Sequence, residues 1–488
     1  MKNHKKINFF TLVSLVVCGS LILNAGAAIG ADTQKFNQEE LVSLTRPSVV
    51  RIAQKVQGEI NLPPFSLDLD KLTINPGGGA AKKIKVDDYL TGSGFIVSED
   101  GYILTNSHVI SKEEIKQQYI ADAATAAIMD ASLWYLGSNN DLNDSAKMDD
   151  YAKKITDYLS KNGTFDLQNK VVVLDPSSKS EKIEDLIAGG FPVSVISVND
   201  NFMQDGWDMA LIKIDQHNLP ALPLGDAASI KRGETIGVFG FPTAAELNGK
   251  NLLESTFSQG VVSAIKDSEN KDFSIIQTDA KISDGSSGSP LLDENGEVIG
   301  MITYQTNKAN GSSGDNFAFA IPIDVVQAGV KKFDVNNTNT QLAPSQYYTQ
   351  FSNGLELLHQ ARCKKALAAF GNVKNVNDKF STSANIQPYE KKCQDLISAG
   401  KSINNIWDEA RNSLYNLSGW IWVIVVAILA ISLAVAGKIF SMKKRLKKEE
   451  KEIVVLEKEL KENKEQDKEE TSELKKIKKE LNEMKSKK

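Results

Sequence analysis

The chain has 488 residues, a length that by itself predicts about three or four domains. An apolar content of 41% and a charged content of 24% are typical of a globular protein and exclude a disordered chain. The net charge of -5 is small for this size, so no global charge signal points to nucleic acid.

Residues 1–31 are predicted to be a secretory signal peptide. A basic start is followed by an apolar run from Phe9 to Leu23 and by small residues from Ala25 to Ala31. More than one triplet of small residues suits cleavage, so the cut is not fixed, and an uncleaved anchor is the alternative. Cys18 is not a lipidation site, because Val17 stands where a small residue is needed.

Residues 32–335 are predicted to form an all-β domain. A short helix and a strand at Pro47–Ile52 open it, and the Pro- and Gly-rich stretch 58–88 is expected to be an irregular loop. Strand signals return from Thr91 to Ile110. From Lys170 to Ile323, short strands alternate with Gly, Asp and Asn turns, which predicts a barrel or a sandwich.

Residues 113–160 interrupt this pattern with a predicted helical insertion. An alanine-rich run at 119–136 is followed by Tyr151, Ile155 and Leu159 at helical spacing. We expect these amphipathic helices to pack on the β domain.

Residues 345–410 are predicted to form a second helical segment, which we place outside the cytoplasm. Cys363 and Cys393 lie in it and are candidates for a disulfide, because such bonds persist in that environment. Two free buried thiols are the alternative.

Residues 419–437 are predicted to be a transmembrane helix in contact with the lipid bilayer. Gly419–Ala436 contains no charged residue and, at about 1.5 Å per residue, reaches about 27 Å, enough to span a bilayer core. Because lysines crowd the segment that follows, we expect the C-terminus to be cytoplasmic and the β domain to be outside the cell membrane.

Residues 438–488 form a highly charged tail with a heptad pattern. Its apolar a/d positions are Ile453, Leu456, Leu460, Leu474, Ile477, Leu481 and Met484. Asn463, Asp467 and Glu470 occupy the core positions between them. The pattern predicts a coiled coil with a polar middle, through which the chain would form a homo-oligomer; a solvated single helix is the alternative. The basic residues here are interpreted as a membrane-surface feature and not as a nucleic-acid site.

Three separated segments carry candidate catalytic residues. They are Gly101–Ile110 with His108, Trp207–Ile214 with Asp208, and Gln277–Leu292 with Gly285-Ser-Ser-Gly-Ser-Pro290. Acyl transfer from a peptide needs a nucleophile, and a serine hydroxyl becomes one when a neighbouring imidazole takes its proton. A carboxylate would hold the tautomer of that imidazole. No metal-ligand cluster appears, and no cofactor is expected.

These blocks resemble those of the trypsin-like serine proteases, specifically the HtrA/Deg branch, over residues 38–330. The order His, Asp, Ser is the trypsin-like order, and the first block includes Thr91–Val97. Pro47–Val50 and Phe319–Pro322 also match the branch. The resemblance implies a double β-barrel that acts on protein or peptide substrates as a serine endopeptidase.

The resemblance also assigns roles to residues. It implies His108 as the base, Asp208 as its orienter and Ser287 as the nucleophile, with an oxyanion hole made by the N–H groups of Gly285 and Ser287. Lys281, six residues before Ser287, is a candidate for the specificity pocket. The helical insertion would then overhang the active site and restrict access; a peripheral hairpin is the alternative.

Two departures from the family pattern bear on function. Ser289 adds a β-carbon where the family has glycine, and Ser286 is a second serine beside the nucleophile, although the spacing from Gly285 and Pro290 selects Ser287. A helical segment and a membrane span stand where a PDZ domain is common, so PDZ-based regulation is not carried over. The alternative function is a catalytically silent binding or sensor protein that links the outside to the cytoplasmic coil.

Overall fold

The computed structural model describes most of the chain outside its N-terminus. The described residues are 36–69, 71–134, 145–246, 250–267, 273–305, 317–334, 342–373, 377–380, 383–403 and 406–485. They divide into two compact units, Met1–Ser402 and Ile403–Lys488. The signal peptide predicted at 1–31 lies outside the described residues.

Six strands close the first barrel of the larger unit. In barrel order they are β1 (Val49–Leu62), β4 (Lys82–Ile96), β5 (Tyr102–Thr105), β8 (Ala210–Ile214), β7 (Phe191–Val198) and β6 (Thr164–Val173). The interior holds β-branched side chains such as Ile52, Ile103 and Ile212, each fully buried, from strands that alternate inward and outward positions. Helix α2 (Gln38–Thr45) leads into β1 and starts with a capping box of Asn37 and Glu40.

Six further strands close a second barrel. In barrel order they are β10 (Thr256–Asp267), β11 (Ser274–Thr278), β14 (Ala318–Pro322), β13 (Val298–Gln305), β12 (Pro290–Leu292) and β9 (Thr235–Gly240). Helix α8 (Ile323–Phe333) follows β14, and two short helices, α6 (Ile183–Gly189) and α7 (Phe202–Asp205), flank β7. The two barrels confirm the predicted double-barrel fold.

The first barrel has three strands that continue past it. β1 pairs with β4 without interruption from Val49↔Phe95 to Leu62↔Lys82, and with β6 as far as Asn61↔Thr164. The prediction of an irregular loop at 58–88 is therefore wrong. This stretch forms the far ends of β1 and β4 and, between them, a hairpin of β2 (Phe65–Asp68) and β3 (Thr73–Pro76). Pro63 and Pro64 lie where β1 leads into the hairpin, and Pro76 to Gly79 lie where the hairpin leads into β4.

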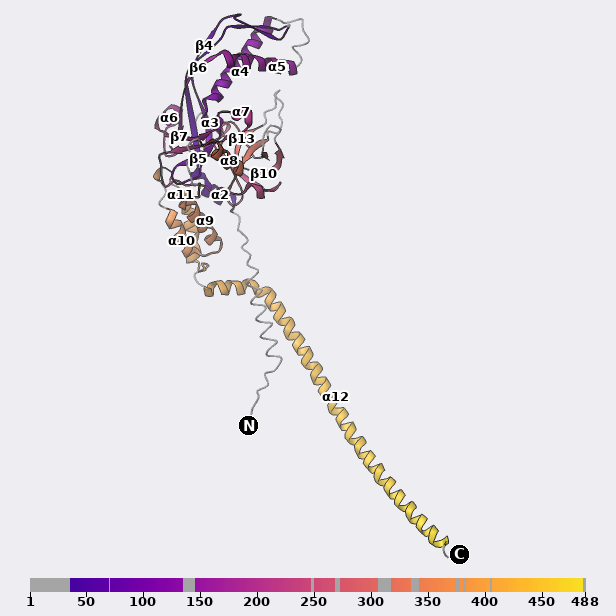
Figure 1. Ribbon diagram of the computed structural model, residues 1–488. Coiled ribbons are helices and arrows are strands. Elements are labelled where there is room, and N and C mark those ends of the chain that lie inside the picture. Colours follow the sequence, from indigo (N-terminus) through magenta and orange to yellow (C-terminus); the bar gives the residue numbers. More distant parts are fainter. Residues whose placement is uncertain are drawn as a thin grey trace. The chain divides into compact units, whose positions relative to one another are not determined.

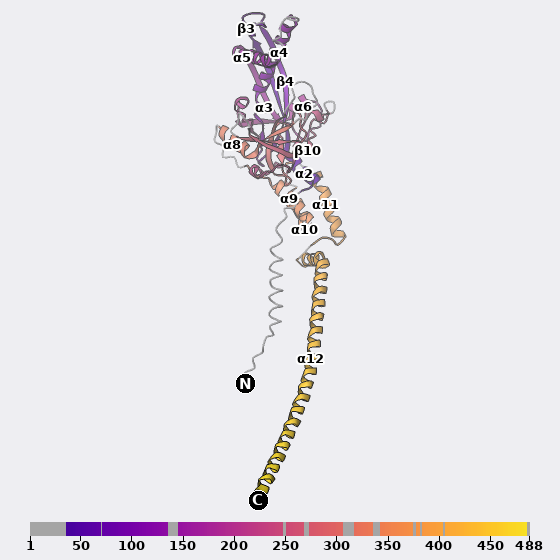
Figure 2. The same cartoon turned by 90° about the vertical axis from the view of Figure 1, so that its right-hand side faces the viewer.

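The predicted insertion forms helices on this extension. They are α4 (Lys112–Trp134) and α5 (Ser145–Asn162), which lie beside the ends of β4 and β6 in both views (Figures 1 and 2). Tyr151, Ile155 and Leu159 are fully buried in one apolar cluster with Ile60 and Val86. The helices thus pack on strands β1, β4 and β6 where these strands continue beyond the first barrel. We call this part the lobe (residues 54–90 and 112–171).

Three helices follow the second barrel within the same unit. They are α9 (Gln346–His359), α10 (Cys363–Asn372) and α11 (Ser383–Ser398). Their apolar faces join the largest core cluster, as with Phe351 and Phe370. Polar contacts fasten them as well: the Tyr348 hydroxyl donates to the Asn295 carbonyl at 2.8 Å. Helices α9, α10 and α11, which lie within the helical segment predicted at 345–410, are therefore an integral part of the larger unit.

The two cysteines of this segment are buried free thiols in the structure, so the expected disulfide is not present. Burial, and then a hydrogen bond with the Cys363 thiol, raise the pKa of Cys393 to about 12. The Cys393 thiol is therefore held in the protonated form, which is the unreactive one.

The smaller unit contains one long helix, α12 (Ile406–Lys485). Among the described residues, none of the helices is both long and apolar enough to cross a membrane. The structure therefore does not support the transmembrane helix predicted at 419–437. The side chains of residues 419–426 lie outside what the structure describes. Four of the predicted a/d side chains are more than half exposed: Ile453, Leu456, Leu474 and Ile477.

Candidate active site

The strand register places His108 beside Asp208. β5 pairs with β8 so that Thr105 lies opposite Ala210. His108 follows β5 in the short helix α3 (Ser107–Ile110), and Asp208 directly precedes β8, so antiparallel pairing brings the two together. The His108 Nδ1 atom lies 2.7 Å from Asp208 Oδ2, and the His108 backbone N–H donates to Asp208 Oδ1 at 3.1 Å.

Side chains around this pair fix its backbone. The Asn106 amide donates to the Asp208 carbonyl at 2.8 Å, and the Ser107 hydroxyl donates to the Met209 carbonyl at 2.7 Å. Both residues are fully buried. The loop that carries the imidazole is thereby fastened to the loop that carries the carboxylate.

Electrostatics favour the ionised carboxylate and a basic imidazole. Burial alone would lower the pKa of His108, but the charge and the hydrogen bond of Asp208 outweigh it and raise that pKa above its ordinary value. Burial alone would raise the pKa of Asp208, but the charge of His108 and hydrogen bonds from His108 and Thr303 lower it. An anion held against one imidazole nitrogen leaves the other free to accept a proton.

Thr303 of β13 joins the carboxylate to the candidate nucleophile. Its hydroxyl, on a residue only 5% exposed, donates to Asp208 Oδ2 at 2.7 Å. Its backbone carbonyl accepts a hydrogen bond from the Ser287 hydroxyl at 3.2 Å. Ser287 is therefore brought to the same place as His108 and Asp208, although it comes from the loop between β11 and β12.

The two adjacent serines point in different directions. Ser286 is buried, and its hydroxyl oxygen accepts from the Ser283 backbone N–H at 3.2 Å, inside its own loop. Ser287 is part-buried, and its backbone carbonyl accepts from the Ser93 N–H of the first barrel at 2.8 Å. Only Ser287 of the two contacts the residue that holds Asp208.

Ser289 is accommodated where the family pattern has glycine. In this loop, positive φ angles occur at Gly285 (86°) and Gly288 (84°) but not at Ser289. The Ser289 hydroxyl lies against Gly240, where a β-carbon would stand 1.9 Å from it. The glycine in β9 thus leaves the room that Ser289 fills. The buried Ser289 hydroxyl has no hydrogen-bond partner among the described residues.

Lys281, the candidate specificity residue, is exposed. Its backbone N–H donates to the Ser258 hydroxyl at 2.9 Å, which fixes the start of the loop but not the direction of the lysine side chain. No described interaction gives this side chain a role.

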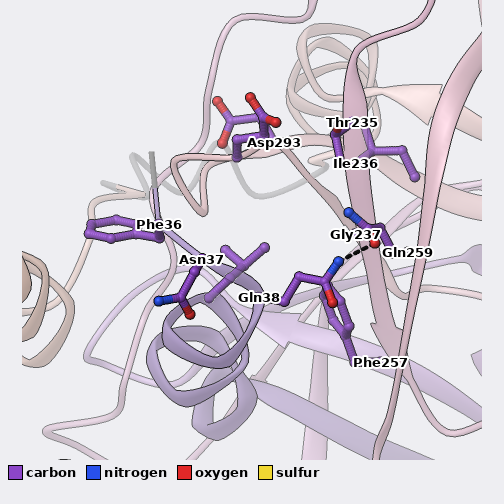
Figure 3. Close-up of a pocket in the computed structure, with 11 residues that line it drawn as sticks. Phe36, Asn37, Gln38, Thr235, Ile236, Gly237, Phe257, Gln259 and Asp293 are labelled. Atoms are coloured by element: carbon purple, nitrogen blue, oxygen red, sulfur yellow. Dashed lines mark hydrogen bonds between the residues drawn. The ribbon is translucent and has the colours of Figure 1, made fainter. Parts of the chain in front are cut away.

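A hollow of about 270 Å³ lies elsewhere, between α2 and the strands β9 and β10. Figure 3 shows Phe36 and Phe257 on its wall and the amide of Gln38 bonded to that of Gln259. None of the candidate catalytic residues lines it.

The sequence reasoning missed Thr303 as part of the site. It lies in an apolar strand segment, Gly300–Tyr304, and carried no motif signal. The Thr91-Gly-Ser-Gly94 motif supports the resemblance but gives Ser93 no role in the site. In the structure, Ser93 is hydrogen-bonded to the Ser287 loop.

Comparison with protein families assigns the fold to a class. Residues 92–301 match the family model described as "Trypsin-like peptidase domain". The match covers strands of both barrels and all three candidate catalytic residues. This part of the chain is therefore similar to a trypsin-like peptidase domain.

Two curated relatives are both named "Probable periplasmic serine endoprotease DegP-like". The one from Pseudomonas fluorescens is 30% identical over 337 residues, covering 65% of this chain and 52% of the relative. The one from Pseudomonas putida is 27% identical over 325 residues, covering 62% and 50%. The chain spans about half the length of these relatives. Among solved structures, "HtrA-type protease AlgW with decapeptide" is 21% identical, with a TM-score of 0.34 over 62% of this chain and 69% of that chain.

Proposed function

We propose that this chain is a serine-type endopeptidase that hydrolyses peptide bonds in proteins or peptides through an acyl-enzyme. The observation that carries the proposal is the 2.7 Å contact between His108 Nδ1 and Asp208 Oδ2, with Ser287 bonded to the same Thr303 that holds Asp208. The names of the DegP-like relatives support the same activity.

In the proposed reaction, the Ser287 hydroxyl turns from the Thr303 carbonyl toward His108 when substrate binds. His108 takes the hydroxyl proton as Ser287 Oγ attacks the carbonyl carbon of the substrate. The imidazolium then gives this proton to the departing amine, so that the peptide C–N bond breaks and an ester remains. Water hydrolyses the ester by the same two proton transfers, and Asp208 stabilises the imidazolium throughout.

The negative charge on the tetrahedral oxygen is proposed to be stabilised by the N–H groups of Gly285 and Ser287. In the described residues, neither N–H donates to a backbone carbonyl. Fixed donors of this kind are each worth about 3–4 kcal/mol in the transition state.

Labelling with a fluorophosphonate, which reacts with activated serines, tests the proposal against a catalytically silent protein. We expect wild type to be labelled and to cleave casein, and Ser287→Ala to lose both while its thermal unfolding stays cooperative. Ser286→Ala is the matched control and should keep both. If wild type resists labelling, or if Ser286→Ala abolishes it and Ser287→Ala does not, the assignment is wrong.

From the sequence alone we also propose that residues 419–437 anchor the chain in the cell membrane, with the peptidase domain outside and the C-terminus cytoplasmic. The word periplasmic in the relatives' names supports that side for the domain. Proteinase added to spheroplasts should digest an epitope near residue 340 and spare one near residue 480. The opposite pattern would overturn the orientation.

The exposed apolar positions of α12 support the proposal that the tail pairs with a second copy as a coiled coil. Cross-linking of the full chain should yield oligomers that disappear when Leu456 and Leu474 are replaced by Asn. Oligomers that persist in that variant would argue against the coil as the interface.

The lobe helices are still proposed to restrict access to the site, since α4 begins four residues after His108. Replacement of 113–160 by a short Gly-Ser linker should speed cleavage of a large folded substrate and leave a small ester unchanged. If the replacement variant folds and cleaves both substrates at the wild-type rates, the lobe does not restrict access.

A further inference from the structure

The orientation of one peptide group decides whether the proposed oxyanion hole exists. The donor is the N–H of Gly285, which belongs to the peptide that joins Asp284 to Gly285. In a planar trans peptide the C=O and the N–H point in opposite directions. If this peptide turned over, the Asp284 carbonyl would face the substrate and repel its developing negative charge.

Two donors from one residue hold the Asp284 carbonyl. The Thr243 backbone N–H donates to it at 2.7 Å, and the Thr243 hydroxyl donates to it at 3.0 Å. Thr243 lies just after β9, in the turn that runs past the Ser287 loop. With its C=O directed at Thr243, the peptide must direct the Gly285 N–H the other way.

The next carbonyl is held from the first barrel. The Ser93 hydroxyl donates to the Gly285 carbonyl at 2.7 Å and accepts from the Phe241 backbone N–H at 2.9 Å. Ser93 is fully buried, so both bonds are shielded from water. The Ser93 hydroxyl therefore joins three segments: strand β4, the turn after β9, and the Ser287 loop.

The position of Gly285 in this loop requires a glycine. Its φ of 86° lies in the region that favours glycine, and a β-carbon there would stand 2.4 Å from the Phe241 carbonyl oxygen. The loop is thus packed against the turn at 241–243, and its successive carbonyls are held by Thr243 of that turn and by Ser93 of β4.

We propose that Thr243 and Ser93 are positioning residues that fix the peptides on either side of Gly285 and so keep its N–H directed into the oxyanion hole. The inference rests on the proposed function, because it concerns the transition state of that reaction. Neither residue contacts the substrate; each acts through a backbone carbonyl.

Thr243→Val tests the proposal, with Thr243→Ser as the conservative control. Valine keeps the shape and the backbone N–H but removes the hydroxyl donor, and serine restores it. We expect kcat to fall about 3–10-fold in Thr243→Val, the range that follows from losing one neutral hydrogen bond, with KM within about twofold. Thr243→Ser should stay within about twofold of wild type in both constants.

A pair of inhibitors separates positioning from a general structural effect. A peptide aldehyde, to which Ser287 Oγ adds reversibly to give a tetrahedral adduct, should bind Thr243→Val more weakly by the factor lost in kcat. The matching peptide alcohol forms no adduct and should bind unchanged. Equal weakening of both inhibitors, or wild-type kcat and aldehyde affinity in Thr243→Val, would overturn the proposal.

Hydrogen exchange supplies a readout that needs no activity. Peptides covering residues 283–289 should exchange faster in Thr243→Val than in wild type or Thr243→Ser. If the wild type cleaves nothing but Thr243→Val still exchanges faster than it, the positioning role is kept and the proposed function is rejected. Ser93→Ala should show the larger effects, since two buried groups lose their partner; if that variant does not fold, Thr243→Val decides alone.

Discussion

Replacing Thr303 by valine isolates the hydrogen bond that the Asp208 carboxylate receives from β13. Valine has nearly the same shape, so packing in the 5%-exposed site is kept and only the donor is lost. The backbone carbonyl that accepts from Ser287 remains. A hydrogen bond to a charged group contributes about 1.5–3 kcal/mol, so we expect the free energy of unfolding to fall by about that amount at pH 7.

The loss should depend on pH in a direction that the structure fixes. The pKa of Asp208 is lowered in the fold, so its ionisation stabilises the native state above its unfolded pKa of about 3.9 and ceases to do so as the pH falls through the lower folded value. Removal of one donor raises the folded pKa. The difference between wild type and Thr303→Val should therefore be full at pH 5–7 and shrink only as the pH falls through the folded pKa values of Asp208.

Urea unfolding at pH 7, 5 and 3.5 measures this, in the Ser287→Ala background so that self-cleavage does not interfere. Thr303→Ser is the control: it keeps the donor and loses one methyl group, a cost of about 0.8 kcal/mol that does not vary with pH. No loss in Thr303→Val at pH 7, or a loss that grows as the pH is lowered, would refute the reasoning.

Three further outcomes are expected. Asp208→Asn should lower kcat by a factor of about 10⁴. In wild type, the acid limb of the kcat/KM profile should have its midpoint above about pH 6.5, because His108 must be neutral to act as a base and Asp208 raises its pKa. In Asp208→Asn this midpoint should move to lower pH. A limb that stays in place in the variant contradicts this coupling. Ser289→Ala removes a buried hydroxyl without a described partner, so thermal unfolding should occur at an equal or higher temperature; a marked drop would show a bond that the structure lacks. Iodoacetamide should modify Cys363 and Cys393 only after unfolding, because both are buried; modification of the native protein would argue against that burial.

The strand signals alone predict a barrel or a sandwich, and the resemblance carried by the three motifs implies the double barrel. Short apolar strands separated by turn residues, and three motifs in a fixed order, need no knowledge of distant contacts. The pairing of His108 with Asp208 was predicted by resemblance, and the register of β5 on β8 gives its physical cause.

The parts that failed depend on contacts far apart in the sequence. The stretch 58–88 has the composition of a loop, yet it forms strands because Ile60 and Val86 find partners on α5, 65 to 99 residues further along the chain. Thr303 and Thr243 are ordinary residues of their own segments. Only the closing of both barrels brings their hydroxyls to Asp208 and Asp284.

Strand β4 begins in the lobe and ends under the Ser287 loop, with Val86 packed among the lobe helices and Ser93 bonded to Gly285. The two residues are seven apart, about 24 Å along one extended strand. Strand β4 is paired with β1 along this whole stretch, so its extended backbone cannot lengthen much and a displacement of the lobe is transmitted to Ser93. One stretch of strand thus connects the position of the lobe to the position of the backbone beside the candidate nucleophile.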